Sequence, residues 1–177
     1  MVALDRTDIG ILRLLQNNAR LSNKEIASAV GLAPSSVHER LKSLWEAGVL
    51  KGAHAEVDPS VFGVGLEALL MIELSKHKRS TVDRFMEDIA GVEEVRAAFL
   101  VTGQHDVVVH VMVRDMQHLK DLVLDQFTNR PGVNRIETSV IFDRRQRHDL
   151  PILGHDSARR PTRNAARLKA EKKPFRV

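Results

Sequence analysis

The sequence predicts an α+β protein in which a helix-turn-helix unit with a small wing precedes a ferredoxin-like βαββαβ domain. Two observations carry this prediction. A capped helix, a glycine and a second amphipathic helix follow one another between residues 22 and 50. The order strand, helix, strand then occurs twice between residues 66 and 142. We place the linker at residues 53–65, where Pro59 and two glycines interrupt the periodicity.

A first helix is expected over residues 5–18. Asp5 is the expected N-cap, because a short acceptor side chain satisfies free amides of the first turn. Ile9, Leu12 and Leu15 recur at helical spacing and are expected to face the core.

A second helix is expected to start after Ser22. Ser22 and Glu25 have the spacing of a capping box, in which each side chain accepts from the other residue's backbone amide. A short apolar stripe follows at residues 26–30. Gly31 then ends the helix, because glycine enters the left-handed conformation without a steric penalty.

The third helix is expected to begin at Pro34, and Val37, Leu41 and Leu44 form its core face. In helix-turn-helix units the second helix of the motif enters the DNA major groove by its N-terminal residues. Residues 49–57 can supply the wing. The domain over residues 1–52 is therefore expected to bind double-stranded DNA. The candidate contacts on and beside the polar face are Ser35, Ser36, His38, Glu39, Arg40 and Lys42.

Less specific interpretations of these residues remain open. A helix, a glycine and a helix often pack together without binding DNA. His38 either touches a base or phosphate or is a solvated helix residue. Arg40 lies about 60° from the core stripe and either braces a neighbouring helix or reaches a phosphate, and we favour bracing.

The composition indicates one or two globular domains. Apolar residues make up 43% of the chain, yet no apolar run reaches the ~18 residues of a membrane span. The first residues lack the basic and apolar regions of a signal peptide. The absence of Cys excludes disulfides and Cys-ligated zinc and favours a cytoplasmic location.

Four strands and two helices are expected in the second domain. The first helix is expected to have Ser80 as its N-cap and to end at Gly91. The second helix is expected to have Asp115 as its N-cap and to end at Pro131 and Gly132. The expected strands are residues 66–74, 92–102, 107–113 and 133–142, with a tight turn at 103–106. The expected inward residues are Val82, Phe85, Met86 and Ile89 in the first helix, and Leu119, Leu122, Val123, Gln126 and Phe127 in the second.

An internal repeat supports the ferredoxin-like order. Each helix is followed by the pattern G-V-x-x-(V/I), beginning at Gly91 and at Gly132. Two successive βαβ units give an antiparallel sheet with both helices on one face.

The other face of this sheet is expected to be apolar. Val108, His110 and Met112 alternate with the valines that face the helices, and Leu69 and Met71 point the same way from the first strand. Such a face should not stay in contact with water. We therefore expect a homodimer that packs sheet to sheet, which also suits two-fold operators.

Taken in order, residues 4–144 resemble the Lrp/AsnC (leucine-responsive, feast/famine) family of prokaryotic transcription regulators. The matching stretches are LDRTDIGILRLLQNNAR, the helix-turn-helix with VHERLKSLWEAGVL, the link VDPSVFG and the turn VTGQHDVVV. The resemblance implies a DNA-binding regulator that responds to an amino acid or a related metabolite and forms dimers, often octamers. Residues 66–146 would be its effector-binding and oligomerisation domain.

The resemblance also implies an effector pocket between protomers near the turn after the second strand. Asp106 could accept from an ammonium group, and the backbone amides of the turn could donate to a carboxylate. The alternative interpretations are that Gly103 serves only the turn and that Thr138 is an ordinary strand residue. The candidate effector contacts are Thr102, Gly103, Gln104, His105, Asp106 and Thr138.

Two residues depart from the family pattern. Ala33 replaces the usual Ser or Thr N-cap of the recognition helix, which forfeits roughly 1 kcal/mol unless Ser35 or Ser36 compensates. His105 replaces an aromatic residue and makes the pocket wall more polar. This favours a polar or aromatic effector over a branched aliphatic one.

Two other functions remain open at this level. One is a metabolite-sensing oligomer that acts through protein partners without DNA, and the other is an enzyme that uses the open sheet face. Against the enzyme, the sequence has no nucleophile–base pair, phosphate loop or paired carboxylates at useful spacing. No catalytic residue, cofactor or metal site is expected, since no two of the eight His stand at i and i+4 on a helix.

Residues 147–177 are expected to form a basic, disordered tail. Residues 155–177 contain eight Lys or Arg and two Asp or Glu, and their composition cannot bury a core. The tail either adds sequence-independent DNA affinity or is solvated without a role.

Deletion of residues 155–177 is expected to flatten the dependence of DNA affinity on salt, because fewer phosphates would be neutralised, and to spare sequence preference. Binding titrations of the full and shortened chains over a range of salt concentrations measure this slope. An identical slope for the two chains would contradict an electrostatic role of the tail.

Overall fold

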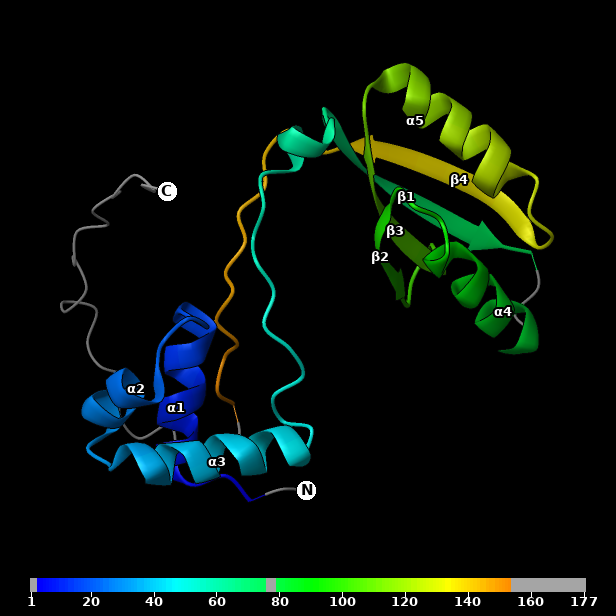
Figure 1. Ribbon diagram of the computed structural model, residues 1–177. Coiled ribbons are helices and arrows are strands. Elements are labelled where there is room, and N and C mark those ends of the chain that lie inside the picture. The colour runs from blue at the N-terminus through cyan, green and yellow to red at the C-terminus, as the bar shows by residue number, and fades with distance from the viewer. Residues whose placement is uncertain (1–2, 76–78, 154–177) are drawn as a thin grey trace. The chain divides into compact units, whose positions relative to one another are not determined.

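Three helices form the N-terminal part of the computed structural model, which describes residues 3–75 and 79–153 (Figure 1). The helices are α1 (Arg6–Asn17), α2 (Asn23–Val30) and α3 (Pro34–Glu46). The chain divides into two compact units between Ala53 and His54. These helices belong to the first unit.

The caps of the first two helices follow from the sequence. Asp5 caps α1, and its carboxylate accepts from the backbone amide of Asp8. Ser22 and Glu25 form the expected capping box of α2, and Gly31 ends this helix at a φ of 72°. These positions of the helix ends confirm the local expectations.

The small core of the first unit differs from expectation in one helix. Ile11 is the fully buried residue of α1, whereas Ile9, Leu12 and Leu15 are only partly buried. The face of α1 that meets the other helices is therefore rotated towards Ile11. The buried cluster consists of Ile11, Ile26, Ala27, Val37 and Leu44.

The segment expected to supply a wing has no regular secondary structure. Residues 50–58 contain neither a helix nor a strand. A short 3-10 helix, η1 (Pro59–Phe62), follows, and Asp58 caps it by accepting from the amide of Ser60. The structured part of the linker is thus a helical turn that leads into the sheet.

The second unit is an antiparallel sheet with helices on one face (Figure 1). The strand order is β2-β3-β1-β4, which is the ferredoxin-like arrangement expected from the two βαβ units. Its strands are β1 (Leu66–Leu74), β2 (Val95–Leu100), β3 (Val107–Val113) and β4 (Val133–Val140). Its helices are α4 (Arg79–Ala90) and α5 (Met116–Leu122), which continues into the π-helical turn η2 (Val123–Thr128).

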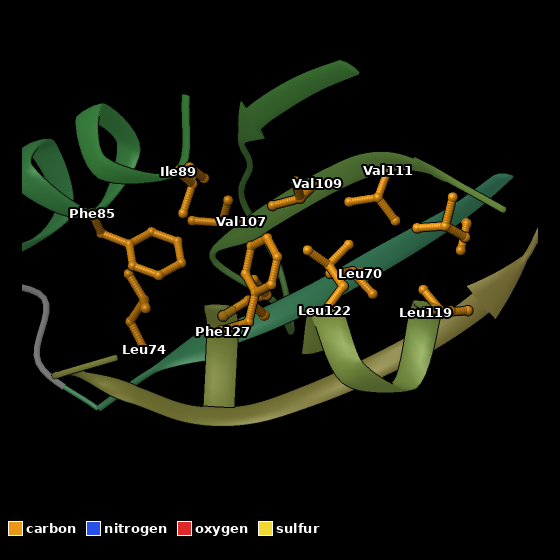
Figure 2. Close-up of a cluster of buried hydrophobic side chains, with 13 residues drawn as sticks. Leu70, Leu74, Phe85, Ile89, Val107, Val109, Val111, Leu119, Leu122 and Phe127 are labelled. Carbon is orange, nitrogen blue, oxygen red and sulfur yellow. The ribbon is translucent and has the colours of Figure 1, made fainter. Parts of the chain in front are cut away.

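The core of the second unit lies between the sheet and its helices. Alternate residues of β1 and β3 are buried, which confirms that one face of each strand packs beneath the helices. Figure 2 shows this cluster, in which the labelled side chains are Leu70, Leu74, Phe85, Ile89, Val107, Val109, Val111, Leu119, Leu122 and Phe127.

Three details of this unit correct the sequence interpretation. Ser80 is not an N-cap, because α4 already begins at Arg79. The strand expected over residues 92–102 is shorter, since residues 92–94 form a turn before β2. Gln126 is exposed rather than inward, because the wider turn of η2 places Leu122 and Phe127, five residues apart, in the same core.

The described part of the C-terminal segment belongs to the first unit. Residues 147–153 group with the three helices, and the amide of Leu150 donates to the Gln16 side chain at 2.6 Å. The basic segment 155–177 lies outside the described residues. Within the described ranges, no helix has both the length and the apolar character needed to cross a membrane.

Candidate nucleic-acid interface and effector-binding turn

The outer face of α3 presents polar side chains near the start of the helix. Ala33 is the N-cap and supplies no side-chain hydrogen bond, so neither Ser35 nor Ser36 replaces the missing cap. Both serines are exposed, as are Glu39 and Lys42. The N-terminal turns of α3 therefore offer hydroxyl groups, a carboxylate and an ammonium group to a partner.

His38 is exposed on the same helix and lies close to α2. Its Nδ1 atom is 3.5 Å from Nδ2 of Asn23. Lys42 makes only a long contact with Glu46, at 4.0 Å between Nζ and Oε1. A surface pair of this length holds a side chain weakly, so Lys42 can turn towards a phosphate.

Arg40 braces α3 against the start of α1. Its NH1 atom donates to Asp5 Oδ2 and to Asp8 Oδ1, both at 2.7 Å. The hydrogen bonds to Asp8 and Asp5 raise the pKa of Arg40. Arg40 is therefore held in the structure by α1, which agrees with the bracing interpretation.

The same contacts act on the cap of α1. The backbone amide of Asp8 and, secondarily, Arg40 lower the pKa of Asp5. Because the folded pKa lies below the unfolded one, this carboxylate stabilises the unit above about pH 4 and loses that effect as pH falls through the folded pKa. The hydroxyl of Ser22 similarly lowers the pKa of Glu25 at the start of α2.

The turn between β2 and β3 is tied to the end of β1. Gly103 has a φ of 124°, which favours glycine at this position. The amide of Asp106 donates to the carbonyl of Ile72 at 2.9 Å, and Asp106 Oδ2 accepts from the amide of Leu74 at 2.7 Å. Asp106 thus has a structural role at the end of β1.

The candidate effector residues do not all gather at this turn. Thr102, Gly103 and Gln104 are exposed on it, and His105 and Asp106 are partly buried. Thr138 lies apart from them, because it pairs across the sheet with Leu70, whose side chain faces the helices.

Glu137, the residue before Thr138, lies on the open face close to the turn. It pairs with Met71 on the open face, and its Oε2 atom is 3.5 Å from Nε2 of His105. Its other oxygen lies 2.9 Å from the guanidinium of Arg135. The alternation of side chains along β4 could have indicated in the sequence that Glu137 lies on the open face, but only if the register of β4 with β1 had been known.

A cavity of about 530 Å³ lies at the opposite end of β1 from the turn. It is bounded by η1, by the first residues of β1 and by the segment that follows β4. Glu67 and Arg144 are the paired charges in its lining, at 3.5 Å. Over residues 3–75 and 79–153, no three His, Asp or Glu gather in a way that could hold a metal ion.

Comparisons with known proteins cover both units. The Lrp/AsnC ligand binding domain matches residues 67–150, and the winged helix-turn-helix DNA-binding model matches residues 4–51. The chain is 34% identical over 146 residues to the transcriptional regulator AzlB of Bacillus subtilis, which covers 82% of this chain and 93% of AzlB. It is 32% identical over 151 residues to the leucine-responsive regulatory protein of Haemophilus influenzae, and the match covers 85% of this chain and 91% of that protein.

A solved structure is similar over nearly the same span. The complex of the transcriptional regulator NMB0573 from Neisseria meningitidis with L-Met superposes with a TM-score of 0.76 at 32% identity. The match covers 82% of this chain and 94% of that one.

Replacing Arg40 with Met is expected to lower the melting temperature of the N-terminal unit by a few degrees, because Asp5 and Asp8 lose their shared cation while the aliphatic stem is kept. Lys42→Met is the matched control, since Lys42 is exposed and weakly paired. Thermal unfolding followed by circular dichroism compares them. Equal melting temperatures for the two variants would contradict a bracing role.

Proposed function

The chain belongs to the Lrp/AsnC family of transcriptional regulators, and on that premise we propose that α3 reads operator DNA while the turn at residues 103–106 binds an amino-acid effector. The observation that carries the DNA-binding part is the polar, exposed start of α3 on a helix that Arg40 holds against α1. A helix fixed in this way can enter the major groove with little loss of conformational entropy.

Different residues of α3 have different roles in this proposal. Ser35, Ser36 and His38 lie near the start of the helix, where base edges and phosphates are reached first. Lys42 contributes a phosphate contact, which adds affinity without sequence preference. Arg40 acts as a positioning residue, because its guanidinium is occupied by Asp5 and Asp8.

The effector part of the proposal rests on the turn and on a relative. The similar regulator from Neisseria meningitidis was solved with L-Met, so an amino acid is the ligand class that we propose here. Gly103 and Gln104 are exposed, and their backbone amides can donate to a carboxylate. The carboxylate of Asp106 accepts from the amide of Leu74, and its negative charge can also attract the ammonium group.

The open face of the sheet is the proposed contact between two copies. Leu69, Met71, Val108 and Met112 lie on it, and Phe99 beside them is 54% exposed. Packing two such faces together removes this apolar area from water. A two-fold dimer also presents two α3 helices to the two halves of an operator. Effector bound beside the interface would change DNA affinity through the arrangement of the copies, a coupling typically of about 1–3 kcal/mol.

Replacing Ser36 and Lys42 together with Ala is expected to weaken operator binding and to reduce the salt slope by about 1, because one phosphate-neutralising charge is lost. Lys120→Ala, which removes an exposed charge from α5, is the control. Gel-shift titrations on the promoter region of the chain's own gene measure both variants. Unchanged operator affinity of the double variant would refute the proposed reading face, and no DNA binding by the native protein would favour a sensor that acts through protein partners.

The effector can be identified by thermal shift against the twenty amino acids, followed by calorimetry. Asp106→Asn is expected to weaken binding of the stabilising amino acid about tenfold, because it removes the charge that attracts the ammonium group while keeping an acceptor for Leu74. Gln104→Ala should also weaken it, and Gln117→Ala on α5 is the matched control. If neither variant at the turn changes the affinity, the effector binds elsewhere.

A further inference from the structure

Two charge clusters of the same composition stand at the two ends of the open sheet face. The first, the Glu67 cluster, joins β1, β3 and the segment after β4: Nε2 of His110 is 2.7 Å from Glu67 Oε2, and Arg144 NH1 is 3.5 Å from the same oxygen. The imidazole is only 12% exposed and the carboxylate 21%.

The second, the Glu137 cluster, lies at the other end of β1. Glu137 Oε2 is 3.5 Å from Nε2 of His105, and Glu137 Oε1 is 2.9 Å from NH2 of Arg135. Each cluster thus contains one glutamate between one histidine and one arginine. With neutral imidazoles, each cluster has no net charge.

The apolar residues of the open face lie next to these clusters. Leu69 and Met71 follow Glu67 along β1, and β3 presents Val108 and Met112 on either side of His110. Any partner that covers the apolar centre also removes water from the charges at its ends. The two imidazoles are therefore close to the surface that association would bury.

We propose that sheet-to-sheet association of two copies of this chain is linked to protons through His105 and His110, so that the dimer weakens when these imidazoles become protonated. This inference rests on the proposed function, because it requires the open face to be the contact between copies. It adds a regulation of that contact, in which acidification favours separate chains.

The sign follows from the charge of each cluster. Proton uptake changes a cluster of no net charge into one of +1. In a single chain, water still reaches part of each imidazole, 18% of His105 and 12% of His110, whereas in the dimer the same charge would lie next to a dehydrated apolar surface. The dimer therefore binds fewer protons than two separate chains do, and by linkage its stability falls as pH falls.

Other charged groups lie around the two imidazoles. His110 faces Glu67 from β1 and Arg144 from the segment after β4, and its neighbour on β2 is the uncharged Ala97. His105 faces Glu137 on β4, and Arg135 of the same strand binds the other oxygen of Glu137. Asp106 follows it in the turn and binds the Leu74 amide, and Glu73 of β1 binds Asn134. The adjacent carboxylates attract a proton in both states, whereas the loss of water occurs only on association.

The test is the dimer dissociation constant of the full chain, measured by sedimentation without effector or DNA. Histidine changes charge between about pH 8 and 5, so measurements at about pH 7.5 and 5.5 span the transition. The dimer dissociation constant of the native chain is expected to be at least about tenfold higher at the lower pH. This corresponds to an average difference of about half a proton between the dimer and two separate chains. The double variant His105→Gln/His110→Gln keeps a donor for each glutamate and is expected to lose this dependence.

The control is His118→Gln. His118 also pairs with a glutamate, Glu94, at 3.0 Å, but it lies on α5 away from the open face, so the control should keep the native pH dependence. If the double variant fails to fold by circular dichroism, each single variant should show a smaller pH dependence than the native chain. A dimer whose dissociation constant is equal at both pH values, or a pH dependence that the histidine variants on the open face retain, would overturn the proton linkage. A chain that is monomeric at pH 7.5 would instead overturn the proposed sheet-to-sheet dimer.

Discussion

The alternation of side chains along β1 and β3 is the constraint on which the second unit depends. In both strands, alternate residues are buried beneath the helices, and the residues between them must face the other way. A shift of one residue in register would exchange the two faces. The same alternation that builds the core from Leu70 and Val109 therefore also builds the apolar surface from Leu69 and Val108. The core and the proposed contact surface are therefore specified by one pattern.

In the first unit, a salt bridge between helices adds to the stability that a very small core provides. Five buried residues hold three short helices together, and α3 lacks the side-chain cap that would fix its start. The guanidinium of Arg40 joins α3 to the capping box of α1 at its two aspartates. Arg40, which the sequence offers as a candidate DNA contact, thus orients α3. The groups that we propose for DNA contact are the smaller and less tightly held ones, Ser36 and Lys42 among them.

Asp106 illustrates how a proposed ligand residue can also have a structural function. Its carboxylate accepts from the last amide of β1, and its own amide donates to the carbonyl of Ile72. The turn is therefore fixed to the centre of the sheet rather than only to its neighbouring strands. Such a turn holds its backbone donors in place before a ligand arrives, which reduces the conformational entropy lost on binding. It also places His105 beside Glu137, so that the proposed effector site and the open face meet there.

The sequence by itself determined the elements and their order, because their signals are local. The N-cap at Asp5, the capping box at Ser22, the glycine at residue 31 and the alternating valines of β3 each act within a few residues. The topology followed from two βαβ units in succession, and the family resemblance extended this to a regulator with a DNA-binding and a ligand-binding domain. Misassigned details, such as Ser80 and Gln126, arose where a helix began earlier or its turn widened, which helical periodicity does not reveal.

Only the tertiary structure decided which side chains meet. The register of β1 with β4 puts Glu137 on the face that His105 reaches, and it puts Thr138 on the opposite face. The packing of α3 on α1 decided that Arg40 meets Asp5 and Asp8, which are more than thirty positions away. The pairing of β1 with β3 brought Glu67 and His110 together in the same way. These contacts depend on strand register and helix rotation, and both are determined by packing over the whole unit rather than by the residues next to each site in the chain.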